Sequence, residues 1–199
     1  MNVWARSIFS VFAVLGMSAS QAQAVIKAPT GMHLFVNDST HIVQVRVKDF
    51  TPDKNTMTLE VEQDLRGKLE QRTFTVNWRI NPKPKDDYYL AELLKRYGPG
   101  QQAILFINDG GKFWRTMQRK GPVTYGCANG NWFFMESTTA ADGKVTFKLT
   151  QGEPWLRGTF KGSTAELNKL LTDHLAGKAK LPEAAKEPPG FGPVFEAKK

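Results

Sequence analysis

The feature that most constrains the fold is the alternation of apolar and polar residues between His41 and Arg79. A period of two residues indicates β-strands that place one face in a core and the other in water. The pattern predicts three strands, whose inward residues are Val43, Val45 and Val47, then Met57, Leu59, Val61 and Leu65, then Phe74, Val76, Trp78 and Ile80. We therefore expect a three-stranded meander at the start of the domain.

The turn at residues 51–55 predicts how the first two strands pair. It contains Pro and Asp, which favour a chain reversal. Folding there places Arg46 and Lys48 near Glu60 and Glu62, and opposite charges across neighbouring strands stabilise their pairing. These carboxylates thus have a structural explanation that requires no catalytic role.

The segment that follows changes to helical spacing and then returns to a strand. Its apolar residues recur three and four positions apart until Gly98-Pro99-Gly100 ends the pattern: Tyr89, Leu90, Leu93, Leu94 and Tyr97. The continuous apolar run from Ala103 to Ile107 predicts a strand that is buried on both faces. The order of elements to this point is β-β-β-α-β.

The second half predicts further hairpins and a helix. Shorter β signals occur at residues 112–118, 131–136 and 145–150, separated by glycine turns such as Asn129-Gly130. Ser163 and Glu166 match a capping box, and leucines at 167, 170, 171 and 175 share one helical face before Gly177. We therefore predict a mainly β protein with two helices, an OB-like Greek-key barrel with added hairpins, a C-terminal amphipathic helix and an extended tail.

Short motifs in residues 42–107 resemble the netrin-module class, which includes the tissue inhibitors of metalloproteinases. They are the alternation Val43-Gln44-Val45-Arg46-Val47, the strand that ends in Leu65-Arg66-Gly67, and Gly98-Pro99-Gly100 leading into Leu105-Phe106. The resemblance implies an OB-like barrel and a compact module that binds another macromolecule. It does not imply zinc-chelating inhibition, because the inhibitors use an N-terminal cysteine and this mature chain would begin at Val25.

The first 24 residues predict export. Arg6, an apolar run over residues 8–17 and the ending Ala22-Gln23-Ala24 are typical of a cleavable signal peptide. No later stretch reaches the roughly 20 apolar residues that a spanning helix needs. We expect a periplasmic or secreted protein with no transmembrane segment in the mature chain, a single domain over residues 25–177 and a flexible, basic, proline-containing tail over residues 178–199.

Candidate chemistry is sparse. His33, His41 and His174 are scattered and form no metal-ligand spacing, and His174 falls on the apolar face of the last helix, where partial burial is expected. Cys127 lacks any local nucleophile signature, and its apolar neighbours predict a buried, inert thiol. We expect no catalytic residues, no metal and no cofactor.

Aromatic and basic residues alternate in the second half, which suggests a binding face. Such a face could bind an anionic polymer, either extracellular DNA or an acidic polysaccharide, because aromatic rings stack and cations pair with acidic groups. The candidate binding residues are Trp114, Arg115, Arg119, Lys120, Trp132 and Arg157. The competing interpretation is that the aromatic residues form the core of the hairpins and the cations their solvated side.

The sequence thus favours an exported, non-enzymatic module with a partly open β-barrel. We expect it to recognise a protein partner in the cell envelope or outside the cell, within a larger assembly. Binding of an anionic polymer is the alternative. The mature chain carries 26 Lys or Arg against 19 Asp or Glu, which is compatible with either hypothesis.

Overall fold

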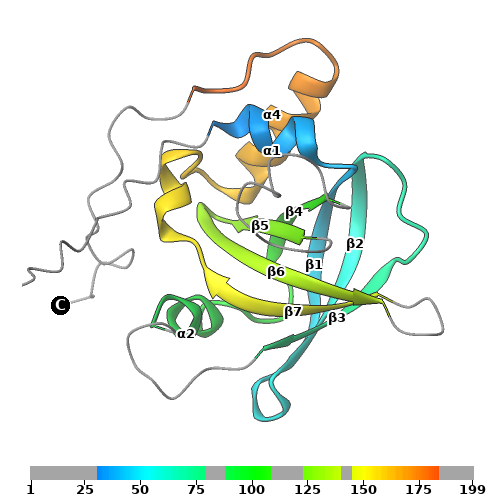
Figure 1. Cartoon of the computed structure of the whole chain (residues 1–199), viewed down its shortest axis with the longest axis vertical. Coiled ribbons are helices and arrows are strands. Elements are labelled where there is room, and N and C mark those ends of the chain that lie inside the picture. The colour runs from blue at the N-terminus through cyan, green and yellow to red at the C-terminus, as the bar shows by residue number, and fades with distance from the viewer. Residues whose placement is uncertain (1–30, 79–87, 109–122, 140–144, 184–199) are drawn as a thin grey trace, which may run out of the picture.

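The computed structural model describes residues 31–78, 88–108, 123–139 and 145–183. These residues form seven strands, three helices and two short 3-10 helices (Figure 1). The strands are β1 (His41–Thr51), β2 (Thr56–Arg66), β3 (Thr73–Trp78), β4 (Gln102–Asn108), β5 (Val123–Ala128), β6 (Asn131–Thr139) and β7 (Val145–Gly152). The helices are α1 (Met32–Asp38), α2 (Tyr88–Lys95) and α4 (Thr164–Leu175), with the 3-10 helices η1 (Pro52–Lys54) and η2 (Pro154–Gly158).

The seven strands close into a barrel in the order β1-β2-β3-β7-β6-β5-β4. β4 pairs back onto β1, and β3 and β7 form a parallel pair, whereas every other pair is antiparallel. A closed barrel with few helices fits an OB-like fold, so the predicted fold class is confirmed. We expected a partly open barrel, which is wrong, because β1 is hydrogen-bonded on both of its sides.

The β1–β2 hairpin has the register that the charges predict. Arg46 lies opposite Glu60, and Asn55 adopts a left-handed conformation with φ of 52° where the chain reverses. The ion pairs run diagonally, from Lys48 to Glu60 at 3.3 Å and from Arg46 to Glu62.

The alternation fails in the second half of β2. The register with β1 shifts by one residue at Glu62 and again at Leu65. Each of these two residues is therefore an extra residue of β2 that has no partner on β1. Bulges of this kind rotate the following side chains to the other face of the strand. Leu65, which we expected inside the barrel, therefore packs against the residues outside it.

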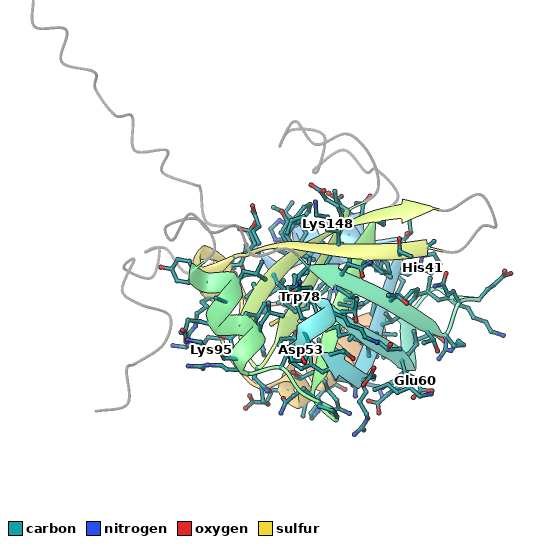
Figure 2. The ribbon with its side chains drawn as sticks, turned by 90° about the horizontal axis from the view of Figure 1, so that it is seen from below. His41, Asp53, Glu60, Trp78, Lys95 and Lys148 are labelled. Carbon is teal, nitrogen blue, oxygen red and sulfur yellow. The ribbon has the colours of Figure 1, made fainter. Side chains whose placement is uncertain are left out.

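The barrel interior forms one hydrophobic core. Apolar side chains from all seven strands fill it, and α2 closes one end with Leu90, Leu93 and Leu94, followed by Tyr97. In Figure 2, Trp78 lies near the middle of the molecule, whereas Glu60 and Lys148 lie toward its outside. The residues predicted to face inward on β1 and β3 do so wherever the structure describes them.

A second core lies outside the barrel, and we call it the outer core. Alternate residues of β4, β5 and β6 point outward and are covered by α1, α4 and η2 (Figure 1). Its buried members include Ile104, Phe106, Tyr125, Cys127, Trp132, Phe134, Leu167 and Leu171. The prediction that the strand at residues 103–107 is buried on both faces is confirmed.

Three described elements were not predicted, namely α1, β5 and the 3-10 helix η2. The β signal expected at residues 112–118 lies outside the described residues. Arg66 fastens α1 to the barrel, because its guanidinium donates to the main-chain carbonyl of Val36. The next residue, Gly67, has a φ of 64° and lies against His41 at the start of β1. A Cβ at Gly67 would approach the carbonyl oxygen of Thr40 to 2.8 Å, so this turn requires glycine.

The last helix follows its predicted signals. Ser163 and Glu166 form the capping box at the start of α4, and the helix ends at Leu175 before Gly177. His174 is half-buried, as predicted, with its Nδ1 atom 3.0 Å from the carbonyl oxygen of Ala179. Leu181 packs against the outer core, so the packed region reaches beyond the expected tail boundary at residue 178.

None of the helices in the described ranges has the length and apolar character needed to cross a membrane.

Candidate functional site

Among the described residues, the helices leave most of the outward side of β1, β2, β3 and β7 uncovered, and we call this surface the open face. Its side chains are Arg46, Lys48, Thr58, Glu60, Thr73, Thr75, Asn77, Thr146 and Lys148, all exposed or half-buried. The helices reach only its margins: Asn168 of α4 bonds to Gln63 near the end of β2, and Tyr89 of α2 lies against Gly152 at the end of β7.

The strand register arranges this face in rows. Thr58, Thr75 and Thr146 are direct neighbours across β2, β3 and β7. The next row contains Asn77 beside Lys148. Because β-branched and short polar side chains cost little conformational entropy when they become ordered, such rows form a pre-organised surface.

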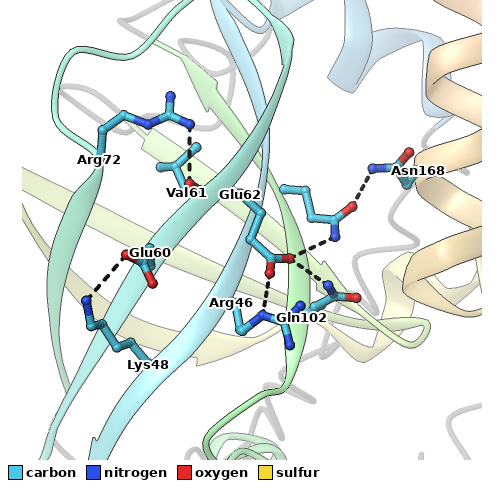
Figure 3. A network of polar contacts seen from close by, with 9 residues as sticks. Arg46, Lys48, Glu60, Val61, Glu62, Arg72, Gln102 and Asn168 are labelled. Carbon is cyan, nitrogen blue, oxygen red and sulfur yellow. Dashed lines mark hydrogen bonds and ion pairs between the residues drawn. The ribbon is translucent and has the colours of Figure 1, made fainter.

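A polar network borders the open face where β1, β2 and β4 meet (Figure 3). Glu62 accepts hydrogen bonds from Arg46, from Gln44 at 3.0 Å and from Gln102 at 2.6 Å. Gln44 in turn accepts from Asn168 of α4. Glu62 can collect donors from two strands because it is the bulged residue of β2.

The donors around Glu62 lower the pKa of its carboxyl group. Partial burial acts in the opposite direction, but the hydrogen bonds from Arg46, Gln44 and Gln102 and the positive charge of Arg46 outweigh it. Glu62 is therefore held as a carboxylate whose oxygens accept hydrogen bonds from side chains of the protein. This arrangement fits a role in structure and not in proton transfer.

The structure does not place the predicted binding residue Trp132 on a surface. Its side chain is 2% exposed, and its indole N–H donates to the carbonyl oxygen of Phe160 at 2.9 Å. The ring packs against both Phe35 and Phe106 in the outer core, and its burial leaves no free face for stacking on a ligand. For Trp132 the competing interpretation, an aromatic residue in the core of a hairpin, is the one that the structure supports.

Of the other predicted binding residues, Arg157 alone lies within the described part of the chain. Arg157 is half-buried on η2. Trp114, Arg115, Arg119 and Lys120 lie outside the described residues.

The described residues contain 14 Lys or Arg and 13 Asp or Glu, so only +1 of the net charge of +8 belongs to them. The open face itself is not strongly basic, because Arg46 and Lys48 are paired with Glu62 and Glu60.

Cys127 is buried as predicted, in the outer core. Burial raises the pKa of its thiol to about 12, although the main-chain N–H of Gly130 donates to the sulfur and acts in the other direction. The thiol therefore stays protonated and poorly nucleophilic. Within the described ranges no group of three His, Cys, Asp or Glu side chains could hold a metal ion.

Sequence reasoning missed both the open face and the Glu62 network. The alternation of Thr73, Thr75 and Asn77 showed which side of β3 faces water. It could not show that β7 would lie beside β3, because a parallel pair joins strands that are far apart in the chain. Gln102 and Asn168 carried no signal, since the partner of Gln102 depends on where the barrel closes and the partner of Asn168 depends on where α4 docks.

Comparisons with known proteins supply no relative, so a function has to be inferred from the structure. No family model matches the chain, and no curated protein or solved structure matches it. The class that the structure defines is a mainly β protein built on a closed, OB-like barrel of seven strands.

Proposed function

We propose that the chain is an exported, non-enzymatic module that binds a protein partner through the open face. The observation that carries the proposal is a contrast in what covers the barrel. Helices bury the outward side of β4, β5 and β6, but on the four neighbouring strands they cover only one end, where Ile42 of β1 and Leu65 of β2 join the outer core. Among described residues the uncovered side is polar, with rows of threonine, and the strand pairing holds these side chains in a pre-organised surface.

The chemistry of the open face favours a protein over an anionic polymer. Its outward side chains include no aromatic ring on which bases or sugars could stack, and two of its cations are neutralised by neighbouring carboxylates. Protein interfaces outside their core are about as polar as the rest of a protein surface, so a face of this composition suits a protein partner. The anionic-polymer hypothesis depends on residues 114–120, which lie outside the described structure.

The ion pairs of β2 and the burial of Cys127 support the proposal of a non-enzymatic role. Glu62, Glu60 and Asp64 of β2 are each engaged in an ion pair, and the Cys127 thiol is buried and protonated. Catalytic acids and bases need pKa values near the working pH and access to a substrate. The Cys127 thiol fails both conditions because burial raises its pKa and hides it from a substrate, and the three carboxylates are committed to their ion pairs.

Site-specific photocrosslinking of the exported chain tests this function. A photoreactive amino acid replaces Thr75 in the middle of the open face, and in a second variant it replaces Ala165, which is exposed on α4. The crosslinked protein is identified by mass spectrometry and purified for binding measurements. We expect position 75 to capture one defined protein, and position 165 not to capture it.

Two substitutions test whether the captured protein binds through the open face. Thr75→Arg should weaken binding of the purified partner at least tenfold, because a long charged side chain prevents close approach, whereas Ala165→Arg should leave binding unchanged. Equal effects of the two variants, or recovery of only DNA or polysaccharide, would contradict the proposal. Fractionation and N-terminal sequencing test export, with Val25 as the expected first residue.

A further inference from the structure

The turn between β5 and β6 is fastened to the start of α4. Asn129 and Gly130 form this two-residue turn, with φ of 49° and 72°. Positive φ at both positions is the conformation that Asn-Gly adopts most readily in a tight hairpin.

Thr164, the first residue of α4, holds the Asn129 side of the turn, and we call this set of contacts the latch. The Asn129 main-chain N–H donates to Thr164 Oγ1 at 3.0 Å, and the Thr164 main-chain N–H donates to Asn129 Oδ1 at 3.1 Å. The Thr164 hydroxyl also lies 3.2 Å from the carbonyl oxygen of Gln102, to which it can donate. The side-chain amide of Asn129 is therefore fixed against the helix.

The Gly130 side of the turn is held as well. Its main-chain N–H donates to the sulfur of Cys127. Its Cα lies against the backbone of Lys161, where an added Cβ would approach the carbonyl oxygen to 2.5 Å. Any change in the backbone length of this turn would therefore be transmitted to the segment that leads into α4.

Asn129-Gly130 is also the single Asn-Gly pair in the 199-residue sequence. Asparagine followed by glycine loses its side-chain amide more readily than other asparagines, because glycine has no side chain to hinder attack by its own nitrogen. Asn129 is exposed, so water reaches it. We propose that Asn129 is a deamidation site whose rate is set by opening of the latch.

The reaction requires only water as a co-reactant. The main-chain nitrogen of Gly130 attacks Cγ of Asn129, the Cγ–Nδ2 bond breaks, and ammonia leaves with the proton from the Gly130 nitrogen, which forms a five-membered imide. Water then adds to one of the two imide carbonyls. Cleavage at Cγ yields aspartate, and cleavage at the main-chain carbonyl yields isoaspartate, in which the backbone runs through Cβ and Cγ.

The two products have different consequences for the fold. Aspartate keeps an acceptor at the position of Oδ1 and places a negative charge at the start of α4, which the helix dipole favours. Isoaspartate lengthens a two-residue turn that has no room beside Lys161. The isoaspartyl form should therefore detach the start of α4 and weaken the cover of the outer core.

Ageing of purified, folded protein in mildly alkaline buffer tests the proposal, with peptide mapping and an isoaspartyl methyltransferase assay as readouts. Thr164→Val removes the hydroxyl of the latch at nearly constant shape. We expect it to accelerate modification of Asn129 roughly five- to tenfold, the effect of losing one or two hydrogen bonds. Thr172→Val, on the exposed side of α4, is the matched control and should leave the rate unchanged.

Further measurements separate latch opening from unfolding. Asn55, exposed and followed by threonine, is the internal reference, because global unfolding would accelerate its deamidation as well. Urea-unfolded chain gives the unprotected rate, which should exceed that of the folded protein. Equal rates in Thr164→Val and Thr172→Val, parallel acceleration at Asn55, or equal rates in folded and unfolded wild type would overturn the proposal.

Discussion

The two sides of the barrel are built from strands of the same sheet, yet they differ in what covers them. β4 and β5 are buried on both faces, between the interior core and the outer core. β2 and β3 bury only their inward residues and expose threonines and paired charges. Apolar residues on the outward side of a strand therefore decide where helices dock, and strands with polar residues there keep a free surface.

The double covering predicts that stability is concentrated on the β4–β6 side. Apolar surface buried on both faces of a strand contributes about twice as much as surface buried on one face, at roughly 25 cal/mol per Å². Substitutions on the open face should therefore change binding more than folding, and substitutions on the other side should do the reverse.

Trp132→Ala should give the largest effect, because it removes the largest fully buried side chain of the outer core. Loss of its ring contacts with Phe35 and Phe106 and of its bond to Phe160 should cost about 3–5 kcal/mol. Urea denaturation measures the free energy of unfolding. Thr75→Val is the control on the open face and should change it by less than about 0.5 kcal/mol; comparable losses would refute the comparison.

Gly126→Ala should destabilise the protein although alanine is ordinarily better than glycine within a strand. A Cβ at this position would meet Cζ of Phe133, its cross-strand neighbour, at 2.0 Å. Overpacking of this kind costs about 1–3 kcal/mol. Phe133→Leu in the same chain should restore part of the loss, and a double-mutant cycle without such coupling would contradict the steric explanation.

Tyr97→Phe should leave the free energy of unfolding unchanged or raise it by up to about 1 kcal/mol. The Tyr97 hydroxyl is buried with no hydrogen-bond partner among the described residues, and burial, with a smaller contribution from Cys127, raises its pKa. Thermal melting measures the change. Tyr97→Leu is the control that also removes the edge contact with Phe133, so it should melt lower; a large loss in Tyr97→Phe would reveal a partner for the hydroxyl.

Glu62→Gln should have the smallest effect, below about 1 kcal/mol, because its pair with Arg46 is partly exposed. The folded-state pKa is lowered, so the Glu62 carboxylate contributes stability above its ordinary value of 4.5 and loses it as the pH falls through the folded value. Urea midpoints at neutral and strongly acidic pH should therefore differ less in Glu62→Gln than in the wild type. An identical pH dependence would show that the network contributes nothing.

Local patterns predicted much of the fold. The hairpin register followed from alternating residues, the turn at residues 51–55 and the charges of Arg46 and Glu60, all within a short stretch of chain. α4 followed from its capping box and leucine spacing. The candidate site was harder to predict. The sequence around Trp132 is the same whether its ring stacks on a ligand or fills a core, and only its position beneath η2 and α1 distinguished these cases.

The sequence by itself determined the mainly β class, the inward residues of β1 and β3, the doubly buried β4 and the start of α4, because these depend on neighbours within a few positions. The tertiary structure alone decided that β4 closes onto β1, that β7 lies parallel to β3, and that Leu65 turns outward past the bulge at Glu62. Those features depend on pairing between segments distant in the chain. Their energy comes from the whole closed barrel and leaves no local pattern in the sequence.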